Sequence, residues 1–266
     1  MIANLTSAYT RADGQGLHAT ALTRGPWHPQ HQHGGPPSAL VCRAIEQSAQ
    51  AHGLTHVGRL TVNLIRPVPI GECQVEVEAE YVGRNAGHYS ARLLAAGKEV
   101  ARFTALMQRE FEMPLPQDTP GHPWPGAPKS PAESSAGQLP FASDDPGYAD
   151  LIETKVAEGR LFHGPCAAWF RMRHPLVGGE EPSPYQRVAV VADCGNGISA
   201  ALDFKRYSFL NCDLTINLLR RPVGDWICLQ SRSAFGGNGC GLAESALYDQ
   251  SGLMGRATQS LAVRPR

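Results

Sequence analysis

Residues 60–66 read LTVNLIR and residues 214–220 read LTINLLR, so one segment occurs twice in this chain. The match continues at a shift of 153 or 154 residues, where YVGRN at residues 81–85 corresponds to AFGGN at residues 234–238. Two long copies are typical of a duplicated fold, because a solenoid stacks three or more short units. The sequence therefore predicts two similar half-domains.

In each copy a helix precedes a series of strands. Residues 38–51 carry apolar side chains at helical spacing and follow two prolines, which suit the first turn of a helix. A second helix is predicted from Pro184 to near Gly195. Segments of period two, typical of strands, follow each helix, and one more precedes each. They are residues 16–23, 57–66, 74–82, 90–95 and 99–108, and residues 167–173, 211–220, 226–235, 242–248 and 253–263.

A proline-rich segment separates the two copies. Residues 111–140 contain eight prolines in thirty residues and almost no aliphatic periodicity, which is typical of a linker. We therefore expect an N-terminal repeat over residues 1–110, a linker over residues 111–159 and a C-terminal repeat over residues 160–266. The class is α+β, with an antiparallel sheet wrapped around a helix in each repeat.

Composition bounds the partners and the compartment. Of the 266 residues 42% are hydrophobic and 18% charged, and the formal net charge is zero. Without a block of like charges we expect neither nucleic acid nor a membrane as a partner. No stretch approaches the roughly 18 apolar residues of a membrane span, and the first twenty residues lack a signal-peptide pattern. Seven cysteines form no Cys-x-x-Cys pair, so we expect reduced thiols and a cytoplasmic location.

Short motifs occur in the same order in which a known family carries them. HGG at residues 33–35 opens the first helix, and LIRP at residues 64–67 ends the strand that follows. In the second copy Asp193 lies at the end of the helix, Asn211 on the next strand and Gln259 on the last strand. This pattern resembles the acyl-CoA thioesterase II (TesB-like) family, which has a threonine where this chain has Asn211. The resemblance covers nearly the whole chain apart from the linker.

The resemblance implies a fold, an activity and a site. The fold is a double hotdog, in which two tandem helix-wrapped antiparallel β-sheet repeats join into one continuous sheet. The activity is hydrolysis of acyl-CoA thioesters to free acid and CoA by a water that an aspartate activates, without a cofactor. The implied catalytic residues are Asp193, Asn211 and Gln259, and the implied substrate-binding residues are His33, Gly34 and Gly35.

The residue types suit this chemistry on their own terms. An aspartate can accept the proton of a water, and an amide can orient that water or donate to an oxyanion. Asp193 lies at the C-terminal end of its predicted helix, where the helix dipole disfavours an ionised carboxylate and makes it a better proton acceptor near neutral pH. Gln259 alternates with apolar residues, and a buried amide without partners costs about 1–3 kcal/mol.

Asn211 leaves an alternative open. It shares parity with Thr215, on the side opposite an apolar row of the same predicted strand. If that polar side faces solvent, Asn211 reaches the site only through a twist or bulge, and Thr215 takes its role. Because the HGG motif and the catalytic residues belong to different copies, we expect the site at the junction of the halves.

Other functions also compete. A non-catalytic acyl-CoA-binding or lipid-binding relative is compatible with Asn211 in place of threonine. An enoyl-CoA hydratase of this fold would need an aspartate and a histidine five residues apart at a helix start, and neither predicted helix start carries them. His28, His31 and His33 lie in a loop without an obvious fourth ligand, so we expect no metal. The duplicated chain contains its own pseudo-dimer and is compatible with a monomer or a homo-oligomer.

Overall fold

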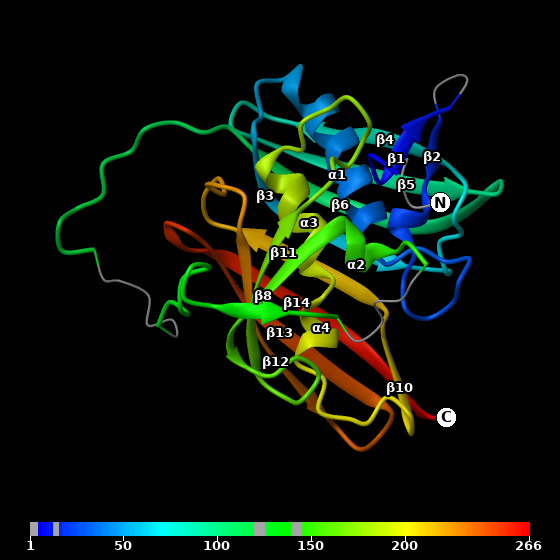
Figure 1. Ribbon diagram of the computed structural model, residues 1–266. Coiled ribbons are helices and arrows are strands. Elements are labelled where there is room, and N and C mark those ends of the chain that lie inside the picture. Colours follow the sequence, from blue (N-terminus) through cyan, green and yellow to red (C-terminus); the bar gives the residue numbers. More distant parts are fainter. Residues whose placement is uncertain (1–4, 13–15, 120–125, 140–144) are drawn as a thin grey trace.

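One antiparallel sheet dominates the structure (Figure 1). The computed structural model describes residues 5–12, 16–119, 126–139 and 145–266. Within these residues the strands are β1 (Tyr9–Arg11), β2 (Leu17–Ala19), β3 (His56–Leu64), β4 (Glu72–Val82), β5 (Ala86–Ala95), β6 (Lys98–Gln108), β7 (Ser135–Gly137), β8 (Ile152–Gly159), β9 (Cys166–Met172), β10 (Tyr207–Asn211), β11 (Asp213–Leu218), β12 (Ile227–Phe235), β13 (Cys240–Asp249) and β14 (Gly252–Pro265). The helices are α1 (Gly35–Gln50), α2 (Tyr148–Leu151), α3 (Pro184–Ala192) and α4 (Gly195–Ile198), with a 3₁₀ turn, η1, over Ala21–Thr23.

The two repeats join through their equivalent strands. The strand order is β1-β2-β4-β5-β6-β3-β11-β14-β13-β12-β9-β8-β7, with β10 paired to β14. In the middle of this order β3 and β11 are antiparallel, and Thr61 lies opposite Thr215, its counterpart in the repeat. Their hydroxyl oxygens are 3.3 Å apart. The predicted double hotdog, with two sheets joined edge to edge, is confirmed.

Two helices cover this sheet and also touch each other. Helix α1 packs against β4, β5 and β6, and α3 packs against β12, β11 and β9. Leu40 and Ile45 of α1 and Val188 of α3 are fully buried, and each such side chain contributes about 1.5–3 kcal/mol by its burial. The start of α1 meets the end of α3, so residues from both repeats come together there (Figure 1).

The strands follow the predicted alternation where one face is covered. In β5, Tyr89, Ala91 and Leu93 are buried, whereas Arg92 between them is exposed. This alternation sets the register, because a slip of one residue would exchange the buried and exposed faces.

Three features differ from the sequence-based expectation. Helix α1 begins at Gly35, since Pro36 and Pro37 fit its first turn rather than preceding it. The segment 111–159 contains β7, α2 and β8, so part of the expected linker belongs to the sheet of the second repeat. The strand predicted over residues 211–220 is divided into β10 and β11 at Cys212.

Candidate active site

Asp193 lies at the C-terminal cap of α3, where the two repeats meet. Its side chain is only 8% exposed. Asn211 donates from Nδ2 to one carboxylate oxygen, Oδ1, at 2.8 Å. Nδ1 of His33 lies 3.2 Å from the other oxygen, Oδ2. A buried carboxylate needs such partners, because burying an unpaired charge is costly.

A bulge brings Asn211 to Asp193. Asn211 pairs with Leu261, whereas Thr215 pairs with Thr258. From Asn211 to Thr215 the chain advances by four residues, whereas the paired stretch of β14, from Leu261 to Thr258, advances by three. The extra residue forms a β-bulge. Residues directly opposite each other in a sheet point to the same face. Asn211 accordingly shares the helix-covered face with buried Leu261, and Thr215 shares the other face with exposed Thr258.

Gln259 holds the end of α3 and the start of α4. It is 2% exposed, and its Nε2 donates to the backbone oxygen of Asp193 at 3.2 Å and lies 3.5 Å from Oδ1. Its Oε1 accepts the backbone N–H of Asn196 at 2.8 Å. The polar residue predicted on the apolar face of the last strand thus has partners at both ends of its amide.

His33 stands between the carboxylate and an aromatic ring. Its imidazole stacks on Tyr148 with ring centroids 3.8 Å apart. Burial lowers the pKa of His33, although the negative charge of Asp193 acts in the opposite direction. A neutral imidazole is therefore favoured at neutral pH, with one nitrogen that donates and one that accepts.

The proton on this imidazole decides which of two contacts is made. Nδ1 lies 3.2 Å from Oδ2 of Asp193 and 3.1 Å from the backbone nitrogen of Gly35. With its proton on Nδ1, His33 donates to the carboxylate; with Nδ1 unprotonated, it accepts from Gly35. The first form suits an ionised Asp193 and leaves the N–H of buried Gly35, one of the first in α1 and without an intrahelical acceptor, without its contact to His33.

The glycine pair is explained by close packing. A Cβ on Gly34 would lie 2.7 Å from Oδ2 of Asp193, and a Cβ on Gly35 would collide with the backbone oxygen of Val190 in α3. Both distances would be shorter than van der Waals contact. At Gly35 the obstacle is backbone, so only glycine lets α1 begin against α3, whereas at Gly34 it is the side chain of Asp193.

Two residues at the site escaped the sequence analysis. Tyr148, from the proline-rich part of the chain, stacks on His33 and donates its hydroxyl to the backbone oxygen of Val190 at 2.8 Å. Asn196 in α4 donates from Nδ2 to the backbone oxygen of Phe209. Within the described residues its buried Oδ1 has no hydrogen-bond partner. Neither residue belongs to a motif or a periodic segment that could have identified it.

A small pocket of about 40 Å³ opens beside the carboxylate. Its lining includes Asp193, Asn211, His33 and Asn196. Cys194 also lines it, but burial raises the pKa of this thiol to about 12, so it stays protonated and is a poor nucleophile. The pocket therefore presents a carboxylate as its proton acceptor.

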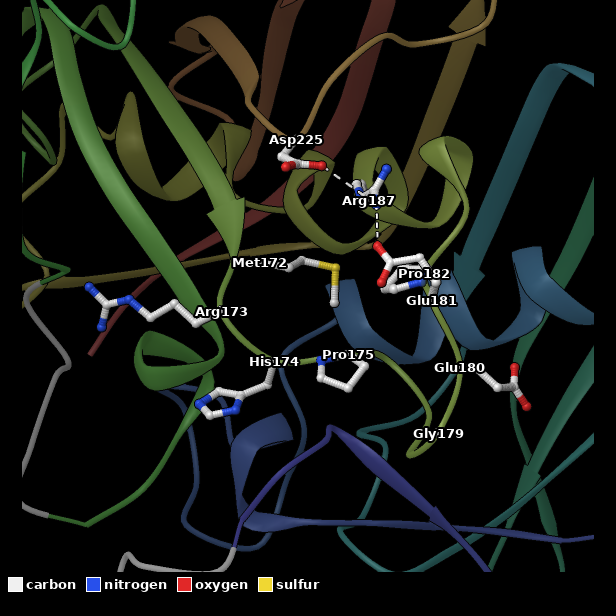
Figure 2. A pocket seen from close by; sticks show the side chains of 10 residues that line it. All are labelled: Met172, Arg173, His174, Pro175, Gly179, Glu180, Glu181, Pro182, Arg187 and Asp225. Carbon is white, nitrogen blue, oxygen red and sulfur yellow. Dashed lines mark hydrogen bonds and ion pairs between the residues drawn. The ribbon is translucent and has the colours of Figure 1, made fainter.

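A separate hollow near the start of α3 has a different character (Figure 2). It measures about 460 Å³ and shares no lining residue with the pocket at Asp193. Arg187 lies between Glu181 and Asp225 and forms ion pairs with them at 2.5 and 3.5 Å. The positive charge of Arg187 in this hollow is therefore balanced by acidic side chains of the same hollow.

The histidine run does not come together as one cluster. His28 and His31 face each other with ring centroids 4.3 Å apart, whereas His33 lies against Tyr148 and Asp193. In the part of the chain that the structure describes, no three histidine, cysteine or acidic side chains form a group that could hold a metal ion. No helix among those residues is long and apolar enough to cross a bilayer.

Fold and site together define a fused pair of hotdog repeats with a carboxylate at their junction. Residues 23–108 match the acyl-CoA thioesterase N-terminal domain, and residues 116–263 match the acyl-CoA thioesterase C-terminal domain. The chain therefore belongs to the acyl-CoA thioesterase family, and its activity is the hydrolysis of acyl-CoA thioesters. No curated protein matches it in sequence.

Solved structures share the fold along nearly the full length. A candidate thioesterase II of Thermobifida fusca superposes with a TM-score of 0.76 at 16% identity, covering 97% of this chain and 96% of its own. A candidate thioesterase of Novosphingobium aromaticivorans reaches 0.70 at 20% identity, covering 96% and 98%. The tesB protein of Mycobacterium avium subspecies paratuberculosis reaches 0.69 at 17% identity, covering 96% and 95%.

Proposed function

We propose that Asp193 is the general base that activates the water for thioester hydrolysis. The observation that carries the proposal is the carboxylate of Asp193, which lines a pocket at the junction of the repeats and is held there by Asn211 and His33. A water in this pocket can donate one hydrogen to the carboxylate. Its lone pair then faces the remaining space of the pocket, where the thioester carbonyl would lie.

The reaction proceeds in two steps. The water oxygen attacks the carbonyl carbon while its proton passes to Asp193, which gives a tetrahedral oxyanion. We expect the backbone N–H of Gly35, at the positive end of the dipole of α1, to donate to that oxyanion when His33 donates to Asp193 instead. In the structure this N–H is directed at His33, and Gly35 does not line the pocket, so the backbone must shift for this contact. Collapse then breaks the carbon–sulfur bond, and the proton on Asp193 passes to the departing CoA sulfur. The products are the free acid and CoA, and Asp193 is regenerated.

Asn211 and Gln259 act in this scheme by holding the base in place. Asn211 bonds Oδ1 directly, and Gln259 bonds the backbone of the same residue. A threonine hydroxyl can donate one hydrogen bond as the Asn211 amide does. Asn211→Thr should therefore retain activity, whereas Asn211→Ala should lower it.

The experiment that tests the function is thiol release from a panel of acyl-CoA thioesters by the purified full chain. We expect CoA to appear with saturable kinetics and in equal amount to the free acid. Binding of acyl-CoA without release of thiol would contradict the proposal and identify a binding protein. Gln259 is compatible with that second function, because both ends of its amide already have protein partners.

Hydration of enoyl-CoA is a further alternative, and no geometry of the site favours it. One aspartate and histidine pair, Asp13 and His18, has the required spacing of five. His18 lies in strand β2, however, and Asp13 lies outside the described residues. The cell compartment stays a proposal: the cytoplasm suits the seven free cysteines, of which five are buried.

A further inference from the structure

A larger groove adjoins the small pocket at Asp193. It measures about 710 Å³. Four residues line both spaces: Pro26, Trp27, Phe162 and Phe204. The groove is therefore the route by which a ligand in the described structure would reach the carboxylate.

Aromatic rings from both repeats form the boundary between the two spaces. Trp27, from the loop before α1, stacks on Phe204, which follows α4, with centroids 5.3 Å apart and planes at 27°. Phe162 lies 5.5 Å from Phe204. The φ angle of Phe162 is 62°, a conformation that bulky residues rarely adopt. Flat apolar faces of this kind suit an extended chain of methylene and amide groups, which is what the pantetheine arm of CoA offers.

The pocket on the inner side is much smaller than the groove. Its volume is about 40 Å³, against about 710 Å³ for the groove. Leu139, Cys194 and Ile198 close it, and all three are buried. This closed and small space favours a short acyl group beside the attacking water.

Positive charge gathers at the outer end. Pairing of β10 with β14 places Ser208 opposite Arg264, and the backbone of Arg266 donates to the backbone oxygen of Arg206 at 3.0 Å. Lys205, Arg206, Arg264 and Arg266 are all exposed, and Arg266 lines the groove. Among the described residues none of these four cations has an ion-pair partner, whereas the whole chain is neutral. We call these four residues the basic cluster.

We infer that the substrate is a short-chain acyl-CoA, because the pocket at Asp193 is far smaller than the groove that leads to it. The acyl group lies in the pocket at Asp193, the pantetheine arm lies along the aromatic groove, and the phosphates of CoA bind the basic cluster. This assignment rests on the proposed thioesterase function and adds the direction and the size class of the substrate. Three observations support it: the small volume of the pocket at Asp193, the aromatic rings that line the groove, and the basic cluster at the outer end of the groove.

Chain-length selectivity tests the inner end. We would measure kcat/KM for acetyl-, butyryl-, octanoyl- and palmitoyl-CoA by thiol release, at concentrations below micelle formation. Butyryl-CoA should exceed palmitoyl-CoA by about tenfold or more, because surplus methylenes have no room. Ile198→Ala should move the preference toward octanoyl-CoA. The control Ile65→Ala removes an exposed side chain outside both spaces and should leave the preference unchanged. A highest value for palmitoyl-CoA would overturn the inference.

Substrates with and without the nucleotide test the outer end. The double variant Arg264→Glu with Arg266→Glu should raise KM for butyryl-CoA about tenfold, and the effect should shrink at high salt as exposed charges are screened. KM for butyryl-pantetheine, which lacks the phosphates, should not change. Lys98→Glu, a charge reversal on the exposed β5–β6 turn, is the matched control and should leave both values unchanged. An equal change for both substrates, or no change for butyryl-CoA, would overturn the assignment of the phosphates.

Binding separates a failure of this inference from a failure of the proposed function. Titration with CoA, followed by tryptophan fluorescence, should show binding that the double charge variant weakens. Such binding without thiol release from any substrate would remove the thioesterase function and keep the groove. Thiol release with a preference for palmitoyl-CoA would keep the thioesterase function and remove the inference of a short-chain substrate.

Discussion

Replacing Gly34 by alanine should reduce catalysis and leave the fold intact. The added Cβ would lie 2.7 Å from Oδ2 of Asp193, whereas ordinary contact begins near 3.4 Å, so the carboxylate must retreat by roughly 0.7 Å. Its hydrogen bond with Asn211, now 2.8 Å, would lengthen or lose its alignment. A misplacement of about 1 Å can cost about 100-fold in rate, so we expect kcat to fall by about 10- to 100-fold.

The backbone at this position accepts alanine, which separates the effect on rate from an effect on stability. Gly34 has φ −67° and ψ −19°, a helical conformation in which alanine stabilises by about 0.4–1 kcal/mol through the unfolded state. Gly35→Ala differs, because its Cβ meets backbone of α3 that cannot rotate away. That variant should lose about 1–3 kcal/mol of stability through overpacking.

Thiol release and thermal unfolding of the same preparations measure both effects. Gly126→Ala is the control, because nothing lies within 4 Å of its added Cβ and both quantities should stay unchanged. If Gly34→Ala keeps the full kcat, the position of the Asp193 carboxylate does not limit the reaction and the reasoning fails.

Three further predictions address the supports of the site and of the fold. Gln259→Ala should lower kcat by about tenfold with little change in KM, since positioning of the base matters chiefly in the transition state; a change in KM alone would contradict this. Burial lowers the pKa of His33. Below about pH 6.5 the unfolded chain therefore takes up a proton at this residue more readily than the folded chain does. The free energy of unfolding should fall as the pH drops from 7.5 to 5.5. Urea denaturation at both pH values should show a smaller fall in His33→Asn, and an equal fall in the variant would refute the assignment. Arg220 makes a bidentate contact at 2.5 and 2.7 Å with Asp249, whose side chain is fully buried. Arg220→Ala should therefore lower the free energy of unfolding, measured by heat or urea, by about 3 kcal/mol. The control Arg102→Ala removes an exposed ion pair and should lower it by less than about 1 kcal/mol.

Periodicity and repetition predicted two similar halves of one helix and several strands, and the family resemblance implied the double hotdog that joins them. The duplicated segment forms β3 and β11. These strands lie side by side at the centre of the sheet, with Thr61 opposite Thr215. This works because alternation and helical spacing are local properties that burial enforces along each element. The proline-rich appearance of residues 111–159 concealed β8, whose pairing with β9 depends on the path of the chain.

The site was harder to predict because it depends on departures from regularity. Alternation alone placed Asn211 on the same side as Thr215, and a single bulge between them separates the two. A bulge adds one residue to one strand, and no periodic signal reports it. Tyr148 and Asn196 reach the site through the packing of short helices, which sequence patterns do not describe.

The central claim is that the carboxylate of Asp193 accepts the proton of the attacking water. Asp193→Asn keeps the shape of the side chain and an oxygen for Asn211, but it removes the proton acceptor. The most direct measurement is kcat of this variant on the best acyl-CoA substrate, with thermal unfolding as a check on the fold. We predict a fall of about 100-fold or more with nearly unchanged unfolding temperature, and near-normal turnover by the folded variant would contradict the claim.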